Sequence, residues 1–69
     1  MLTMSRLEFL AELNRRLMAH ADYEPGMEFI FAPPGAMADD ARGFGWNPPE
    51  AAEPMTSIAR AAGDEIVVS

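Results

Sequence analysis

Apolar residues recur at helical spacing through the first third of the chain, and charged residues fill the positions between them. Ser5 and Glu8 have the spacing of a capping box, in which each side chain binds the other's backbone amide. The pattern predicts a helix over residues 5–21, which ends before the turn-forming residues 24–26. In so small a domain this apolar stripe is expected to be core rather than a partner-binding face. Its main members are Leu7, Leu10, Leu13 and Leu17.

In two short segments, large apolar residues then recur at every second position. Residues 27–32 and 42–46 are therefore predicted to be strands, with Pro34-Gly35 between them in a type II turn. In the second strand Phe44 and Trp46 lie on one face, and two glycines leave the other face bare. Another backbone or a side chain is expected to approach this bare face closely. A phosphate-binding loop is the alternative, but the glycines lack its spacing and its lysine.

The last third predicts a helix over residues 54–62 and a strand over residues 65–68. Pro54 suits the first turn of that helix, and Gly63 suits the position just beyond its end. Residues 1–69 then form one domain in the order helix, strand, strand, helix, strand. This order predicts an α+β fold with a three-stranded, mostly antiparallel sheet, the first helix packed on one face and the second beside it.

The net charge and its distribution limit the classes of function that this chain can have. The 69 residues hold 11 acids and five bases, all arginine, for a net charge of −6, and they contain no cysteine. Nine of the acids fall within residues 22–69, against two arginines. Such a chain repels nucleic acid and anionic membranes and attracts basic protein surfaces. No apolar run is long enough to span a membrane, and charges interrupt the N-terminal segment, so we expect neither a membrane anchor nor a signal peptide. The composition fits the cytoplasm.

Little in the sequence indicates chemistry. His20 is the single histidine, and Asp22 would point in another direction if the helix continued. These two residues, with Asp39 and Asp40, could supply metal ligands, but they lack a compact ligand spacing. No serine has the context of a nucleophile. We therefore expect a protein that is not an enzyme and takes no metal or cofactor.

The remaining candidate for function is the acidic surface. Carboxylates held in rows on a rigid support can enter a groove lined with arginine and lysine, where arginine–carboxylate pairs are geometrically favourable. Any single acid is better explained as a solvated side chain, so the hypothesis concerns the ensemble. The predicted partner-binding acids are Glu28, Asp39, Asp40, Glu50, Glu53, Asp64 and Glu65.

In its size, its lack of cysteine, its helix beginning Ser5-Arg6-Leu7-Glu8 and its acid-rich remainder, the chain resembles small phage-encoded anti-CRISPR proteins. It is most similar to the acidic type I-C inhibitors that imitate double-stranded DNA. The resemblance implies a cytoplasmic inhibitor that occupies the DNA-binding surface of the Cascade large subunit. Three arginines at positions 6, 15 and 16 depart from a uniformly acidic mimic, which implies that the first helix faces away from the partner.

A second function class remains open. A small interaction module or adaptor would use an apolar patch anchored by Tyr23, Phe44 and Trp46, because aromatic residues dominate interface energetics. Such a module could also form a weak homodimer by pairing the edge strand at residues 66–68.

Overall fold

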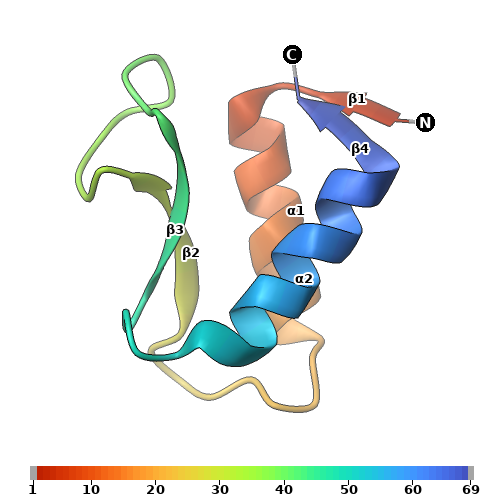
Figure 1. Ribbon diagram of the computed structural model, residues 1–69, viewed down its shortest axis with the longest axis vertical. Coiled ribbons are helices and arrows are strands. Elements are labelled where there is room, and N and C mark those ends of the chain that lie inside the picture. The colour runs from red at the N-terminus through yellow and green to blue at the C-terminus, as the bar shows by residue number, and fades with distance from the viewer. Residues whose placement is uncertain (1, 69) are drawn as a thin grey trace.

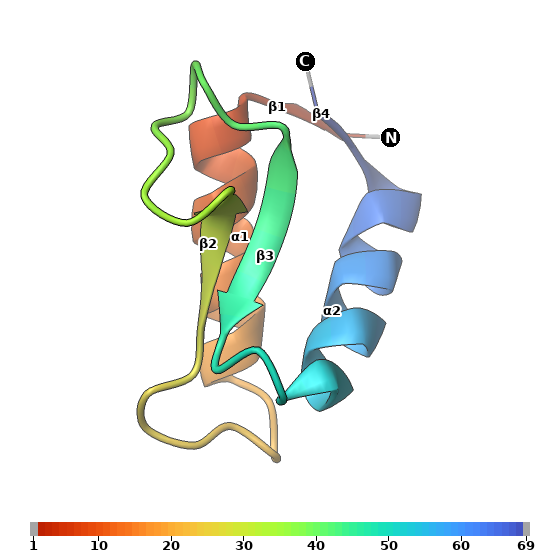
Figure 2. The same ribbon diagram turned by 60° about the vertical axis from the view of Figure 1, so that its left-hand side comes forward.

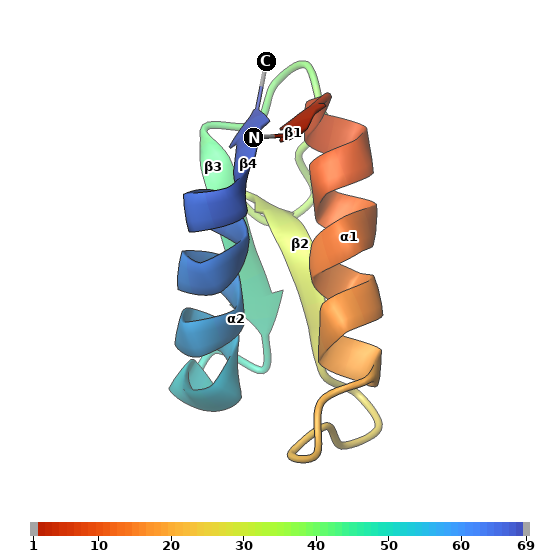
Figure 3. The same ribbon diagram turned by 90° about the vertical axis from the view of Figure 1, so that its right-hand side faces the viewer.

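The computed structural model describes residues 2–68 and packs two antiparallel helices side by side against a β-hairpin (Figures 1 and 3). The elements are β1 (Leu2–Met4), α1 (Arg6–Met18), β2 (Glu28–Ala32), β3 (Gly43–Asn47), α2 (Ala52–Glu65) and β4 (Ile66–Val68). β1 and β4 lie together at the end of the molecule where the chain begins and ends (Figure 1). The fold is α+β, as predicted.

The predicted three-stranded sheet is wrong. Within the described residues, β2 pairs only with β3, antiparallel and with Phe29 opposite Trp46, whereas β4 pairs with β1, parallel and with Ile66 opposite Leu2. No sequence pattern indicated β1, because a strand of three residues is too short to show an alternation. Since α2 runs away from the hairpin, it delivers β4 to the N-terminal segment instead (Figure 1).

The capping box of α1 is confirmed. Ser5 Oγ accepts a hydrogen bond from the Glu8 amide at 3.2 Å, and Glu8 Oε1 accepts one from the Ser5 amide at 2.9 Å. The helix ends at Met18, three residues before the predicted limit of 21. The chain turns there because the His20 amide donates to the Leu17 carbonyl and the Asp22 amide donates to His20 Nδ1.

The buried stripe of α1 is narrower than predicted. Leu13 and Leu17 are fully buried and Phe9 is nearly so, but the side chain of Leu7 remains 64% exposed. Residues four apart along the helix thus form the stripe, because the hairpin and α2 cover only that strip of the helix surface.

α2 is longer than predicted at its C-terminal end. Its bounds are Ala52–Glu65, but Glu53 has an extended backbone, so the continuous helix begins at Pro54 as predicted, whereas Gly63 lies inside the helix instead of ending it. Its buried face is the predicted one, formed by Met55, Ile58 and Ala62. The helix continues past Gly63 until Ile66 takes up an extended conformation and joins β4.

The hairpin contributes aromatic side chains to one shared core. Phe29 is buried, and Phe44 and Trp46 pack against the core from β3. The ring centroids of Phe9 and Phe44 are 5.2 Å apart, and those of Phe29 and Trp46 are 6.3 Å apart, both edge to face. These contacts position the hairpin across the helix pair (Figure 2).

The turn between the strands is confirmed, but the close approach to the glycine face is not. The Ala36 amide donates to the Pro33 carbonyl at 3.0 Å, and Gly35 has the positive φ of 88° that a type II turn requires. Nothing lies within 4 Å of a Cβ placed on Gly43, and on Gly45 the nearest atom is the Ala32 Cβ at 3.8 Å, an ordinary contact.

The Asn14 side chain binds the free edge of β2. Its Oδ1 accepts from the Phe29 amide at 2.7 Å, and its Nδ2 donates to the Phe29 carbonyl at 3.2 Å. One side-chain amide therefore replaces the two hydrogen bonds that a neighbouring strand would make at this residue. This pair of bonds fixes the hairpin to α1 at a defined position.

Candidate functional site

Acidic residues gather at the end of the molecule opposite the chain termini. We call residues 19–28 and 47–53 the acidic end; these segments connect α1 to β2 and β3 to α2, and they lie together in Figure 1. The acidic end contains no arginine or lysine, whereas the six acids elsewhere are nearly offset by all five arginines. Most of the net charge of −6 therefore resides here. Its acids are Asp22, Glu24, Glu28, Glu50 and Glu53.

Three of these carboxylates share one shallow depression. Asp22, Glu24 and Glu53 line a cavity of about 420 Å³ together with Tyr23 and Pro54, and all three acids are exposed. The depression forms because the connection after α1 folds beside the first turn of α2. Its walls thus carry acids from two segments that are about 30 residues apart in sequence.

The acids of this end have polar neighbours but make no ion pair with an arginine within the described chain; Asp22 lies 4.0 Å from His20, a contact that is an ion pair only when the imidazole is protonated. Glu53 Oε2 accepts a hydrogen bond from Ser57 Oγ at 2.8 Å, and Glu28 Oε1 accepts a longer one from Asn47 Nδ2 at 3.4 Å. Neither donor is charged, so the negative charge remains available to an external cation.

The other four predicted acids lie elsewhere, so the seven do not form one surface. Asp39 and Asp40 belong to the connection between β2 and β3, at the far end of the hairpin (Figure 1). Glu65 accepts a hydrogen bond from Arg16 Nη1 at 2.9 Å and is paired. Asp64 lies along α2 in a groove that Arg60 also lines.

Two acids of the candidate site, Asp22 and Glu24, were absent from the predicted set. They lie on either side of Tyr23, just before Pro25-Gly26, in a stretch that was predicted to be a helix end followed by a turn. The available signal was the absence of arginine from both connecting segments. Only the fold shows that these two segments meet.

His20 and Asp22 are closer than expected. Because α1 has already ended, His20 Nδ1 lies 4.0 Å from Asp22 Oδ2 and accepts a hydrogen bond from the Asp22 amide at 3.0 Å. The expectation that the two side chains diverge is therefore wrong. Within residues 2–68 no three His, Asp or Glu side chains converge as metal ligands do. Within the described residues, the His20 imidazole has one carboxylate beside it, that of Asp22, and it makes no hydrogen bond with a hydroxyl group that could act as a nucleophile.

The three aromatic residues proposed as interface anchors pack against the core instead of being exposed. Tyr23, Phe44 and Trp46 are half-buried and pack against the buried cluster. The large apolar side chains that are exposed belong to other positions. These are Leu2, Leu7, Met18, Met37, Val67 and Val68.

Comparisons with known proteins identify no relative: no family model matches the chain, and no curated protein or solved structure is significantly similar. Within the described residues, neither helix has the length and apolar character that crossing a bilayer demands. The candidate site therefore rests on geometry and charge.

The ion pairs of α1 predict how stability depends on pH. Hydrogen bonds from Arg15 at 2.6 and 2.8 Å and from Arg16 at 2.8 Å lower the pKa of Glu12 from 4.5 to about 2. Because the pKa is lower in the folded state, this stabilisation is complete above pH 4.5 and is lost as the pH falls toward 2. Partly exposed pairs contribute about 1 kcal/mol or less. Urea unfolding from pH 7 to 2 should show that Glu12→Gln removes this part of the acid-induced loss.

The control for that measurement is Glu50→Gln, which removes an exposed acid that has no ion pair within the described residues. It should leave the pH dependence close to that of the unmodified protein. Equal slopes for Glu12→Gln and the unmodified protein between pH 5 and 2 would contradict a stabilising role of these pairs.

Proposed function

We propose that this is a non-enzymatic binding protein that docks its acidic end onto a surface lined with arginine and lysine. The observation that carries the proposal is the gathering of five acids, none of them paired with an arginine within the described chain, at an end that holds no arginine or lysine. Carboxylates of this kind accept bidentate hydrogen bonds from guanidinium groups. The core fixes the two segments that present them, so little ordering is needed on binding.

The partner that fits best is a protein surface made for nucleic acid, and the resemblance to type I-C inhibitors makes the DNA-binding surface of the Cascade large subunit the specific candidate. Duplex DNA presents one negative charge per about 1.7 Å of its axis, so its binding sites concentrate positive charge. A compact group of carboxylates can occupy part of such a site and exclude DNA by competition. The protein would act in the cytoplasm, where such complexes work.

The test is inhibition of DNA binding by a type I-C surveillance complex, measured over a range of salt concentrations. We expect inhibition that weakens steeply as salt rises, since screening acts over about 8–10 Å at physiological ionic strength. The variant Asp22→Asn/Glu24→Gln/Glu53→Gln should weaken inhibition at least tenfold, because it removes three charges from one depression.

A matched variant separates local charge from total charge. It removes three charges as well, but from positions outside the acidic end, by the substitutions Asp39→Asn, Asp40→Asn and Asp64→Asn. This variant should change inhibition less than threefold. Equal losses from both variants would show that only net charge matters. No inhibition by the unmodified protein at any salt concentration would exclude this partner.

A second candidate is an apolar interaction module, and one observation favours it. Leu2 is 60% exposed and Val67 46% exposed, and both belong to the two-stranded β1–β4 sheet. A partner or a second copy that covers this sheet would bind with little dependence on salt. Leu2→Ser would then weaken that association, whereas the acidic-end variant would leave it unchanged.

A further inference from the structure

The five arginines differ in their surroundings. Arg15 and Arg16 are paired with Glu12, and Arg60 lines a groove together with Glu53 and Asp64. Three arginines make no ion pair within residues 2–68: Arg60, whose groove contains two acids, and Arg6 and Arg42. In a chain with 11 acids, the absence of a described carboxylate beside Arg6 and Arg42 is notable. They line the same cavity.

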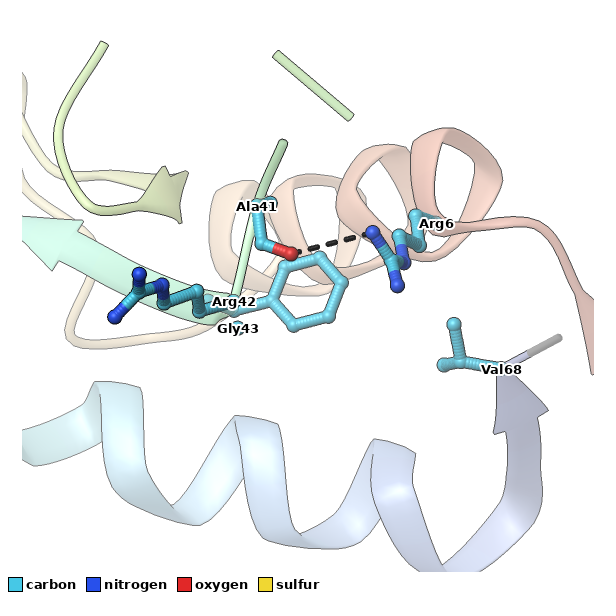
Figure 4. A pocket seen from close by; sticks show the side chains of 6 residues that line it. Arg6, Ala41, Arg42, Gly43 and Val68 are labelled. Atoms are coloured by element: carbon cyan, nitrogen blue, oxygen red, sulfur yellow. Dashed lines mark hydrogen bonds between the residues drawn. The ribbon is translucent and has the colours of Figure 1, made fainter. Parts of the chain in front are cut away.

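This cavity lies between the start of α1, the start of β3 and the end of β4, and is thus remote from the acidic end (Figures 1 and 4). It has a volume of about 240 Å³, and none of the described residues that line it is an acid. Phe44 and Val68 supply apolar surface beside the charged groups. A basic, partly apolar cavity in an acidic protein points to an anionic ligand that carries an apolar portion.

Arg6 is held so that part of its guanidinium remains available. Its Nη1 donates to the Ala38 carbonyl at 2.9 Å and to the Ala41 carbonyl at 3.2 Å, bonds that use both hydrogens of that nitrogen. A guanidinium has five N–H donors. The Nε and Nη2 edge, which has the geometry of a carboxylate fork, makes no hydrogen bond within the described residues.

We propose that this cavity binds a small organic carboxylate. The carboxylate pairs with the Nε–Nη2 edge of Arg6, and the apolar part of the ligand packs against Phe44 and Val68. The guanidinium of Arg42 points along β3 and away from Arg6 in Figure 4, so it contributes positive potential at the rim instead of a direct contact. The fixed position of Arg6 favours a planar carboxylate over a larger, more highly charged anion.

The cavity volume sets the size of the ligand. Sites for drug-sized molecules measure roughly 300–1,000 Å³, so this cavity suits one aromatic ring or a short aliphatic chain. A ligand of that size has few atoms, and its dissociation constant is expected in the millimolar range. Benzoate is a suitable probe, because neutral benzamide has the same shape without the charge.

The test is an NMR titration of the full chain with benzoate, benzamide and inorganic phosphate. We expect benzoate to shift the amide signals of residues 41–44 and 68 saturably, and benzamide to leave them unchanged. Inorganic phosphate should bind at least tenfold more weakly than benzoate. Identical effects of benzoate and benzamide, or phosphate binding as tight as that of benzoate, would overturn the assignment to carboxylates.

Two neighbouring substitutions provide a matched pair. Val68→Asp puts a competing carboxylate in the cavity wall and should reduce benzoate affinity at least tenfold. Val67→Asp adds the same charge to the adjacent exposed residue of β4, which does not line the cavity, and should change affinity less than threefold. Arg6→Lys keeps the charge but removes the planar fork, so it should also weaken binding at least fivefold.

Each outcome bears on the proposal. Unchanged binding by Val68→Asp or by Arg6→Lys, in variants whose spectra show an intact fold, would place the benzoate elsewhere and overturn it. The acidic-end variant used above should bind benzoate as the unmodified protein does. Failure of this inference therefore leaves the proposed function intact, and the reverse also holds.

Discussion

Replacing Leu13 with alanine is expected to remove about half or more of the stability of this protein. Leu13 is fully buried at the centre of the core stripe of α1. Such truncations cost about 2–5 kcal/mol, because they lose apolar burial and leave a cavity. A domain of this length has roughly 3–10 kcal/mol in total. Urea unfolding followed by circular dichroism should show a large fall in the midpoint, or a chain largely unfolded without denaturant.

Leu7→Ala is the matched control for this experiment. It makes the same chemical change on the same helix, but at a side chain that is 64% exposed. Its effect on the free energy of unfolding should stay within about 0.5 kcal/mol, as for most surface substitutions. The sequence pattern alone assigns both leucines to one buried stripe, whereas the structure exposes Leu7. Comparable losses of stability at the two positions would therefore contradict the orientation of α1.

The second large effect is expected at Asn14. Asn14→Ala leaves the amide and the carbonyl of Phe29 without their partners in a partly buried place. An unsatisfied backbone group costs about 1–3 kcal/mol, and access of water to this site reduces the loss, so we expect about 2 kcal/mol in all. Urea unfolding measures the total effect. Hydrogen exchange at the Phe29 amide, which should accelerate at least tenfold, locates it.

Asn47→Ala tests whether this effect is specific to Asn14. Asn47 is exposed at the end of β3, and its side chain makes one long hydrogen bond of 3.4 Å to Glu28. Its removal should change the free energy of unfolding by about 0.5 kcal/mol or less. If the Asn14 and Asn47 variants were equally stable, the side chain of Asn14 would not be what holds the edge of β2.

The candidate site could be predicted from the sequence only in part. Charge counting located an acidic surface, but it grouped seven acids that the fold distributes between the two ends of the molecule. It did not include Asp22 and Glu24, because a helix end and a turn explained that stretch locally. Arg6 was noted as a departure from a uniformly acidic mimic, yet its cavity depends on β3 and β4, whose relative placement the sequence did not reveal.

The sequence alone determined the features that depend on neighbouring residues. The capping box at Ser5, the turn at Pro34-Gly35, the two hairpin strands and the buried face of α2 follow from backbone and side-chain chemistry within a few positions. The net charge of −6 likewise needed no structure.

Only the tertiary structure decided which distant segments meet. It ended α1 at Met18, exposed Leu7, and joined β4 to a β1 that had no sequence signal. It also placed two connecting segments without arginine side by side to form the acidic end. The physical reason is that these outcomes depend on which surfaces remain to be covered once the core of Phe9, Leu13 and their neighbours has formed.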